Sequence, residues 1–164
     1  MDHDDLVALL ARLDIDCVRV DHPAVFTVEE SDRLVPAMRG ARTKNLFLRD
    51  KKGRRHLLVV AVHDKRVDLK RLADVVDAKG LSLASDERLL AHLGVTPGSV
   101  SILALANDGA RAVELFVDRD VWRQDTVLAH PLVNTATLAI PREGLARFLA
   151  HTGHAPTVVD VPAA

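Results

Sequence analysis

A continuous apolar run in the first half of the chain places the tightest constraint on its fold. The run Leu57-Leu58-Val59-Val60-Ala61-Val62 shows no polar alternation. A strand of this kind is buried on both faces, which requires a sheet covered by helices instead of an exposed ribbon. The turn Asp50-Lys51-Lys52-Gly53 separates it from an alternating segment, so the sequence predicts a hairpin of strands 46–49 and 56–62.

Helical and strand patterns alternate through the rest of the chain. Helices are predicted over 4–13, after the capping residue Thr27 to near Leu34, after the caps Asp68 and Ser85, and from Pro141 to near Gly153. Further strands are predicted over 17–20, 99–105, 112–117, 126–130, 135–140 and 157–161, with 99–105 and 112–117 paired as a second antiparallel hairpin. We therefore expect a single α+β domain over 1–164, with a strongly curved, barrel-like mixed sheet and helices packed around it.

Composition narrows the classes of function. The formal charge of −1 and the pI near 6.7 restrict nucleic-acid binding to a local basic patch. With 3% aromatic residues and no tyrosine, base recognition on aromatic platforms is not indicated. Cys17 is the single cysteine, which excludes an internal disulfide and predicts a buried, unreactive thiol. His151 and His154 lack a third ligand nearby in sequence, so we expect no metal and no cofactor.

Targeting signals and association motifs are not evident in the sequence. It shows no signal peptide, lipidation motif or membrane-length apolar run. We therefore expect a cytoplasmic protein without a membrane partner. No sustained heptad pattern is present either, which favours a monomer.

The segment Gly40-Ala-Arg-Thr-Lys-Asn has the chemistry of an anion-binding site. Lys44 and Asn45 stand at the mouth of the first hairpin strand, and Gly40 permits a tight turn before them. Arg39 and Arg42 add positive charge. A phosphate or carboxylate of a ligand would suit Lys44, although a solvated lysine at a strand end is the alternative interpretation.

Two further segments carry polar groups in restricted backbones. In Ala129-His130-Pro131-Leu132-Val133-Asn134-Thr135-Ala136-Thr137, the proline forces His130 into an extended conformation, and short polar side chains follow. The loop Gly94-Val95-Thr96-Pro97-Gly98-Ser99-Val100 permits close backbone approach, so its N–H groups could bind a carbonyl oxygen or a ribose. The alternative is a plain connection between a helix and a strand. His22 precedes a proline, and a structural role is expected for it.

Together these segments, in this order and spacing, resemble the YbaK/prolyl-tRNA synthetase-associated editing domain family over nearly the whole chain. The likeness is greatest to its free-standing ProXp-ala (PrdX) branch, which deacylates tRNA for proline mischarged with alanine. One departure is Ser101-Ile102-Leu103, where many relatives have Pro-Phe, and it affects one wall of the pocket. The resemblance implies a hydrolase that acts on the acceptor end of tRNA and that associates, in one variant of the hypothesis, with prolyl-tRNA synthetase.

Site residues follow from the motifs and the resemblance together. The catalytic candidates are Lys44, His130 and Asn134. The candidates for substrate binding are Asn45, Gly94, Thr96, Gly98 and Ser99, with Val25, Phe26, Met38 and Leu132 as an apolar wall. Lys44 would bind the terminal phosphate or polarise the ester, the glycine loop would hold the carbonyl, and His130 with Asn134 would orient the ribose or the amino group.

No covalent nucleophile stands out, and none is needed. An activated ester requires a positioned water, which the 2′-hydroxyl of the substrate would help to place, and electrostatic stabilisation. Cysteine or serine could replace alanine as the amino acid removed. A non-catalytic module that binds tRNA or a synthetase, and an inactive interaction protein, are the competing hypotheses. In the hypotheses that involve tRNA, the basic residues of the hairpin would contact phosphates next to the acceptor end.

Overall fold

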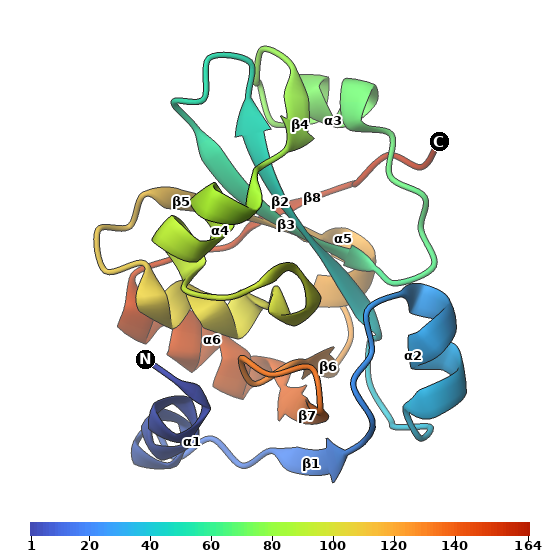
Figure 1. The fold of residues 1–164 in the computed structure, drawn as a ribbon, viewed down its shortest axis with the longest axis vertical. Coiled ribbons are helices and arrows are strands. Elements are labelled where there is room, and N and C mark those ends of the chain that lie inside the picture. Colours follow the sequence, from blue (N-terminus) through green and yellow to red (C-terminus); the bar gives the residue numbers. More distant parts are fainter.

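The computed structural model describes residues 1–164, apart from the side chain of Val28. Two sheets form its framework (Figure 1). The larger has the order β4 (Leu81–Leu83), β2 (Thr43–Asp50), β3 (His56–Val62), β5 (Val113–Asp118), β8 (Thr157–Val159). The smaller has the order β1 (Val18–Asp21), β7 (Ala136–Pro141), β6 (Thr126–Ala129). The predicted α+β class is confirmed.

The larger sheet is mixed, as expected. Strands β2 and β3 form the predicted antiparallel hairpin, with Thr43 opposite Val62, whereas β5 pairs with β3, and β8 with β5, in parallel. A single bridge between Ala41 and Val127 connects the two sheets. Strands β4 and β8 end the larger sheet, so the strands form a curved, open arrangement instead of a closed barrel.

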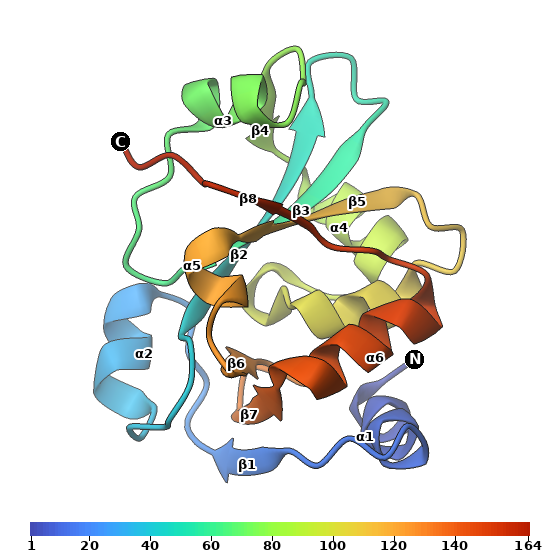
Figure 2. The ribbon, with the colours of Figure 1, turned by 180° about the vertical axis from the view of Figure 1, so that it is seen from behind.

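Strand β3 is buried on both faces, which confirms the constraint drawn from its apolar run. Leu58 and Val60 belong to the main core, to which α6 (Arg142–Thr152) and α4 (Asp86–Leu93) contribute leucines. Leu57, Val59 and Ala61 point to a smaller core beneath α3 (Leu69–Val75). Figure 2 shows α6 crossing the lower part of the molecule with α3 at the opposite end.

The helices begin at the predicted caps. The side chains of Thr27, Asp68 and Ser85 accept hydrogen bonds from backbone N–H groups in the first turns of α2 (Val28–Leu34), α3 and α4. The first helix, α1, spans His3–Arg12, and a short unpredicted helix, α5, spans Arg119–Trp122. Pro141, predicted in the first turn of the last helix, instead ends β7 and directly precedes α6.

The predicted strand over 99–105 is wrong. Two short 3₁₀ helices occupy this region, η1 (Pro97–Ser99) and η2 (Ile102–Asn107). The Ser101 side chain accepts a hydrogen bond from Leu103 N, which caps η2. The apolar run after Ser101 is buried throughout, and such a run fits a buried helix as well as a strand. Strand β5 consequently pairs with β3 and has no hairpin partner at 99–105.

A buried carboxylate fastens the end of η2 to α6. Asp108 accepts hydrogen bonds from Ala112 N at 3.1 Å and Val113 N at 2.8 Å, and from His154 Nε2 at 2.8 Å. The side chains of Asp108 and His154 are 3% and 2% exposed. Burial alone would raise the pKa of Asp108, but the hydrogen bonds from His154 and the two backbone groups outweigh it, so the pKa is lowered. The carboxylate therefore ties the loop before β5 to the segment after α6.

Candidate functional site

Two adjoining compartments lie where the two sheets meet. Their volumes are about 50 and 160 Å³, and we call them the small and the large compartment. Both are lined by Thr43, Asn45, His63 and His130. A larger depression of about 360 Å³ beside α6 is lined by Leu149, alanines, a glycine and a proline, so it offers no side chain for acid–base or electrostatic chemistry.

The start of β2 brings Lys44 and Asn45 to the compartments. Strand β2 begins at Thr43, three residues earlier than predicted, so Lys44 is held in the ladder opposite Ala61. Lys44 lines the large compartment, and none of the ion pairs among the described residues involves its ammonium group. A half-buried cation on a rigid strand is therefore available to a ligand.

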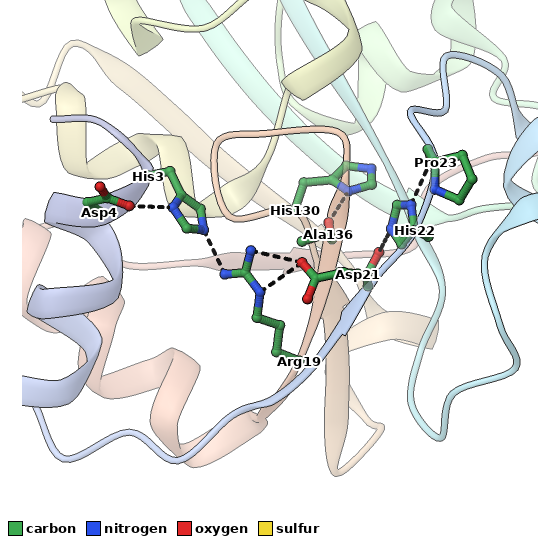
Figure 3. A network of polar contacts seen from close by, with 9 residues as sticks. His3, Asp4, Arg19, Asp21, His22, Pro23, His130 and Ala136 are labelled. Carbon is green, nitrogen blue, oxygen red and sulfur yellow. Dashed lines mark hydrogen bonds and ion pairs between the residues drawn. The ribbon is translucent and has the colours of Figure 1, made fainter.

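His130 follows β6 and reaches both compartments. Its Nδ1 donates a hydrogen bond to Ala136 O at 3.2 Å, so the lone pair of the neutral ring is on Nε2 (Figure 3). Burial lowers the pKa of His130; the hydrogen bond to Ala136 opposes this change, and the neighbouring His22 adds to it. His130 is consequently a neutral base at neutral pH.

His22 supports this arrangement from the side of β1. Its Nδ1 donates to Pro23 O at 2.9 Å, which leaves Nε2 to accept a hydrogen bond from Thr137 Oγ1 at 2.8 Å (Figure 3). The rings of His22 and His130 lie edge to face, with centroids 6.4 Å apart. His22 is buried and fully bonded, in agreement with its predicted structural role.

Arg42 does not supply free positive charge to the site. Its guanidinium contacts Asp32 Oδ1 at 2.6 Å and donates to Ser31 Oγ at 3.0 Å, which fastens α2 to the edge of β2. His63 Nε2 lies 3.5 Å from the same Asp32 oxygen. Sequence reasoning did not select His63, because a histidine at the end of a strand carries no distinctive signal.

Two buried acceptors line the compartments without a partner. Asn45 Oδ1 and His63 Nδ1 are the buried side-chain polar atoms that lack a hydrogen bond within the described part of the chain. Buried polar atoms are nearly always bonded, and an unpaired one costs about 1–3 kcal/mol. Their coincidence at one site indicates that a ligand or water supplies the missing donors.

The segment before α2 forms the outer wall. Val25 is buried and lines the large compartment together with Phe26, which is 70% exposed. Asn134 Nδ2 donates to Val25 O at 3.3 Å, and Val25 N donates to Asn134 O at 3.3 Å. Asn134 thus cross-links two loops and is absent from the lining of either compartment.

The glycine loop contributes less of its length than expected. Gly98 lines the large compartment, and a Cβ at this position would come 2.9 Å from Phe26 Cδ1 and 3.2 Å from Asn134 Nδ2. Gly94 ends α4 in a left-handed conformation with φ 66° and packs against Asn107. Of the other predicted residues, four lie outside the lining of both compartments: Thr96, Ser99, Met38 and Leu132.

The basic residues of the hairpin divide between its two ends. Lys44 lies at the compartments, whereas the turn with Lys51 and Lys52 begins seven residues later, roughly 23 Å along an extended strand. Arg55 near the turn is engaged by Glu114 at 2.8 Å. The hairpin therefore presents two separate basic regions.

The described residues contain neither a cluster of metal ligands nor a membrane-spanning helix. No group of three or more His, Cys, Asp or Glu side chains is placed to hold a metal ion. None of the described helices combines the length and the apolar character needed to cross a membrane. Cys17 is half-buried, and burial raises the pKa of its thiol.

Known proteins resemble this chain over most of its length. Residues 22–148 match the family described as aminoacyl-tRNA editing domain. The prolyl-tRNA editing protein ProX of Acetoanaerobium sticklandii is 36% identical over 98% of this chain and 100% of its own length. Prolyl-tRNA synthetase associated domain-containing protein 1 of Danio rerio is 40% identical over 95% of this chain and 85% of its own length.

Solved structures share the fold. A crystal structure of a hypothetical protein superposes with a TM-score of 0.73 at 21% identity, over 95% of this chain and 97% of the other. Another crystal structure, described as a candidate trans-editing enzyme for prolyl tRNA synthetase, superposes with a TM-score of 0.71 at 20% identity, over 100% of this chain and 99% of the other. The resemblance drawn from the three motifs is confirmed, and the chain belongs to the aminoacyl-tRNA editing domain family.

Proposed function

We propose that this protein is a trans-editing deacylase that hydrolyses alanine from mischarged tRNA for proline. Water adds its oxygen to the ester carbonyl carbon, the bond from that carbon to the ribose oxygen breaks, and the ribose oxygen takes a proton. The products are free alanine and tRNA with both terminal hydroxyls. The relative ProX, a prolyl-tRNA editing protein that this chain matches over its whole length, supports this reaction class.

The observation that carries the proposal is the meeting of an unpaired cation and a neutral base at one cavity. Lys44 and His130 reach the large compartment from different sheets. The ammonium group is suited to the phosphate or to the developing oxyanion of the ester. The Nε2 lone pair of His130 is suited to accept a proton from the 2′-hydroxyl or from the water that this hydroxyl positions.

The unpaired acceptors complete the fit to an aminoacyl ester. The α-ammonium group of the substrate carries three donors. Asn45 Oδ1 and His63 Nδ1 line the same compartments and lack donors within the described chain. Asp32 Oδ1, which lies 3.5 Å from His63 Nε2, favours the ring proton on that nitrogen and so leaves Nδ1 as an acceptor. In our proposal these groups hold the amino group while Lys44 faces the ester.

Selectivity would come from the small compartment. Its volume is about 50 Å³, and Val35, Leu128 and Ala129 supply its apolar wall. A synthetase site shaped for proline rejects the smaller alanine only weakly, because each missing methylene group reduces the binding free energy by only about 1–3 kcal/mol. A second site that admits a methyl group and excludes the proline ring corrects this error. Replacing Val35→Ala should therefore increase prolyl-tRNA hydrolysis relative to alanyl-tRNA hydrolysis.

The decisive experiment compares hydrolysis of alanyl-, prolyl-, cysteinyl- and seryl-tRNA for proline by the wild type, Lys44→Ala and Lys52→Ala. We expect alanine to be released fastest, with a loss of about 10²- to 10³-fold in Lys44→Ala, the effect of removing one oxyanion donor. Lys52 is exposed at the hairpin turn and lines neither compartment, so Lys52→Ala should keep kcat even where it weakens tRNA binding, and it serves as the matched control.

Other outcomes reassign the function. Faster loss of cysteine or serine would keep the deacylase and change its substrate. Survival of every ester, with tRNA still bound, would refute catalysis and leave the binding module as the function. Adding prolyl-tRNA synthetase to each assay tests the proposed association, which should raise the rate on alanyl-tRNA.

A further inference from the structure

Phe26 is an exposed aromatic side chain at the mouth of the large compartment. It is 70% exposed, although burial of a phenyl ring is favourable. Other exposed large apolar side chains of the described chain, such as Val18, Leu83 and Leu90, are aliphatic and line neither compartment. We propose that Phe26 is the platform on which the base of the substrate's terminal nucleotide stacks. This inference rests on the proposed function.

The backbone that carries Phe26 is held on both sides. Val25 exchanges two hydrogen bonds with Asn134, and its side chain is buried. Thr27, the next residue, caps α2 through a bond from Glu30 N at 3.1 Å. The ring is thus displayed from a fixed backbone. A preorganised side chain loses little conformational entropy when a ligand binds.

The glycine loop holds one side of the ring and leaves the rest open. A Cβ at Gly98 would lie 2.9 Å from Phe26 Cδ1 and 3.0 Å from Cε1, so the ring rests against bare backbone there. No aromatic partner packs on Phe26 among the described residues. The open part of the ring is consequently available to a planar group from outside the protein.

The chemistry around the ring selects a nucleobase as that group. Lys44 and His130 line the same compartment and match an ester with its ribose, while Asn45 matches the amino group of the acyl part. The base is the flat, aromatic part of an aminoacylated nucleotide end, and it projects from the ribose on the side away from the acyl group. Every base has a π face, so such a platform gives affinity without reading sequence. The low aromatic content of the chain had argued against such a platform, yet one well-placed ring suffices.

A double-mutant cycle between the ring and the base tests the proposal. The substrates are a short RNA alanyl ester ending in adenosine and the same ester ending in an abasic ribose. The enzymes are the wild type, Phe26→Ala, Phe26→Leu and Phe26→Trp, each with its thermal midpoint measured. With adenosine, Phe26→Ala and Phe26→Leu should lose about 5- to 150-fold in kcat/KM, and Phe26→Trp should retain activity. With the abasic substrate, all four enzymes should be nearly equal.

The outcomes separate the stacking from the reaction. Equal losses on both substrates would overturn the stacking and assign Phe26 a structural role, which a lowered thermal midpoint would accompany. Retention of full activity by Phe26→Leu on the adenosine substrate would also overturn it. Failure of the wild type to hydrolyse the adenosine ester would instead refute the proposed function.

Discussion

Replacing Asp108→Asn should destabilise the fold strongly while leaving the compartments untouched. The carboxylate, which is 3% exposed, accepts from two backbone N–H groups and from His154, whose side chain is 2% exposed. An amide turns one of these acceptor positions into a donor and leaves His154 without its charged partner. Breaking a buried pair of this kind costs about 3–5 kcal/mol. For a chain of this length, a loss of 1 kcal/mol lowers the midpoint of thermal unfolding by about 2–4 °C, so the midpoint should fall by about 6–20 °C.

The assay is thermal and urea unfolding at pH 7, followed by far-UV circular dichroism. Asp160→Asn is the matched control, because that carboxylate is 84% exposed and pairs with Arg119 at 3.0 Å. An exposed pair contributes about 0–1 kcal/mol, so the control should unfold almost as the wild type does. A loss below about 1 kcal/mol for Asp108→Asn would refute the argument that this contact fastens η2 to α6.

Three further predictions concern the Phe26 ring, the pH dependence of activity and the pH dependence of stability. Gly98→Ala should lower kcat/KM at least about 5-fold, because the added methyl group displaces the Phe26 ring. The midpoint of thermal unfolding should change by no more than about 2 °C, because the exposed ring can move into solvent. Burial lowers the pKa of His130, so the acidic limb of the kcat/KM profile should have its midpoint below about 6.5. Burial also lowers the pKa of His56 in the folded protein, and the neighbouring His92 adds to this effect. Below about pH 6.5 the unfolded chain therefore binds more protons than the folded protein. The free energy of unfolding should consequently fall as the pH drops from about 6.5 to the pKa of His56 in the folded protein. His56→Gln should reduce that pH slope in urea unfolding.

Each of these has its own control. Gly109→Ala should be neutral, since no atom lies within 4 Å of a Cβ at that position; equal effects of the two glycine variants would contradict the argument for Gly98. An acidic midpoint above about 6.5 would show that His130 is not the base that titrates. An unchanged pH slope in His56→Gln would assign the acid sensitivity to other groups.

Local chemistry made most of the fold predictable. The helix caps at Thr27, Asp68 and Ser85 and the turn after Asp50 were readable because each depends on neighbours in sequence. The region 99–107 was not, since a short buried apolar run fits a strand or a helix equally. Parallel pairing of β3 with β5 depends on partners far apart in the chain, which no local pattern specifies.

The site was predictable where a motif carried it. Lys44, Asn45, Gly98 and His130 were selected from short segments, and the structure brings them to one compartment. Charge counting failed for Arg42, because its partner Asp32 lies on another element and neutralises it. Val25 and Phe26, predicted as parts of an apolar wall, do line the large compartment, but no sequence pattern showed that the Phe26 ring is exposed.

The bridge between Ala41 and Val127 has a kinetic consequence. It joins two sheets that each combine strands from the first and the second half of the chain, so the compartments exist only once both sheets have formed. From Phe26 to His130 the ribosome adds 104 residues, which takes about 5–20 s at the usual rates of synthesis. Non-local pairing of this kind also closes slowly, on a scale of roughly milliseconds to seconds. During refolding, deacylation should therefore return with the last phase, after the helices have regained their ellipticity.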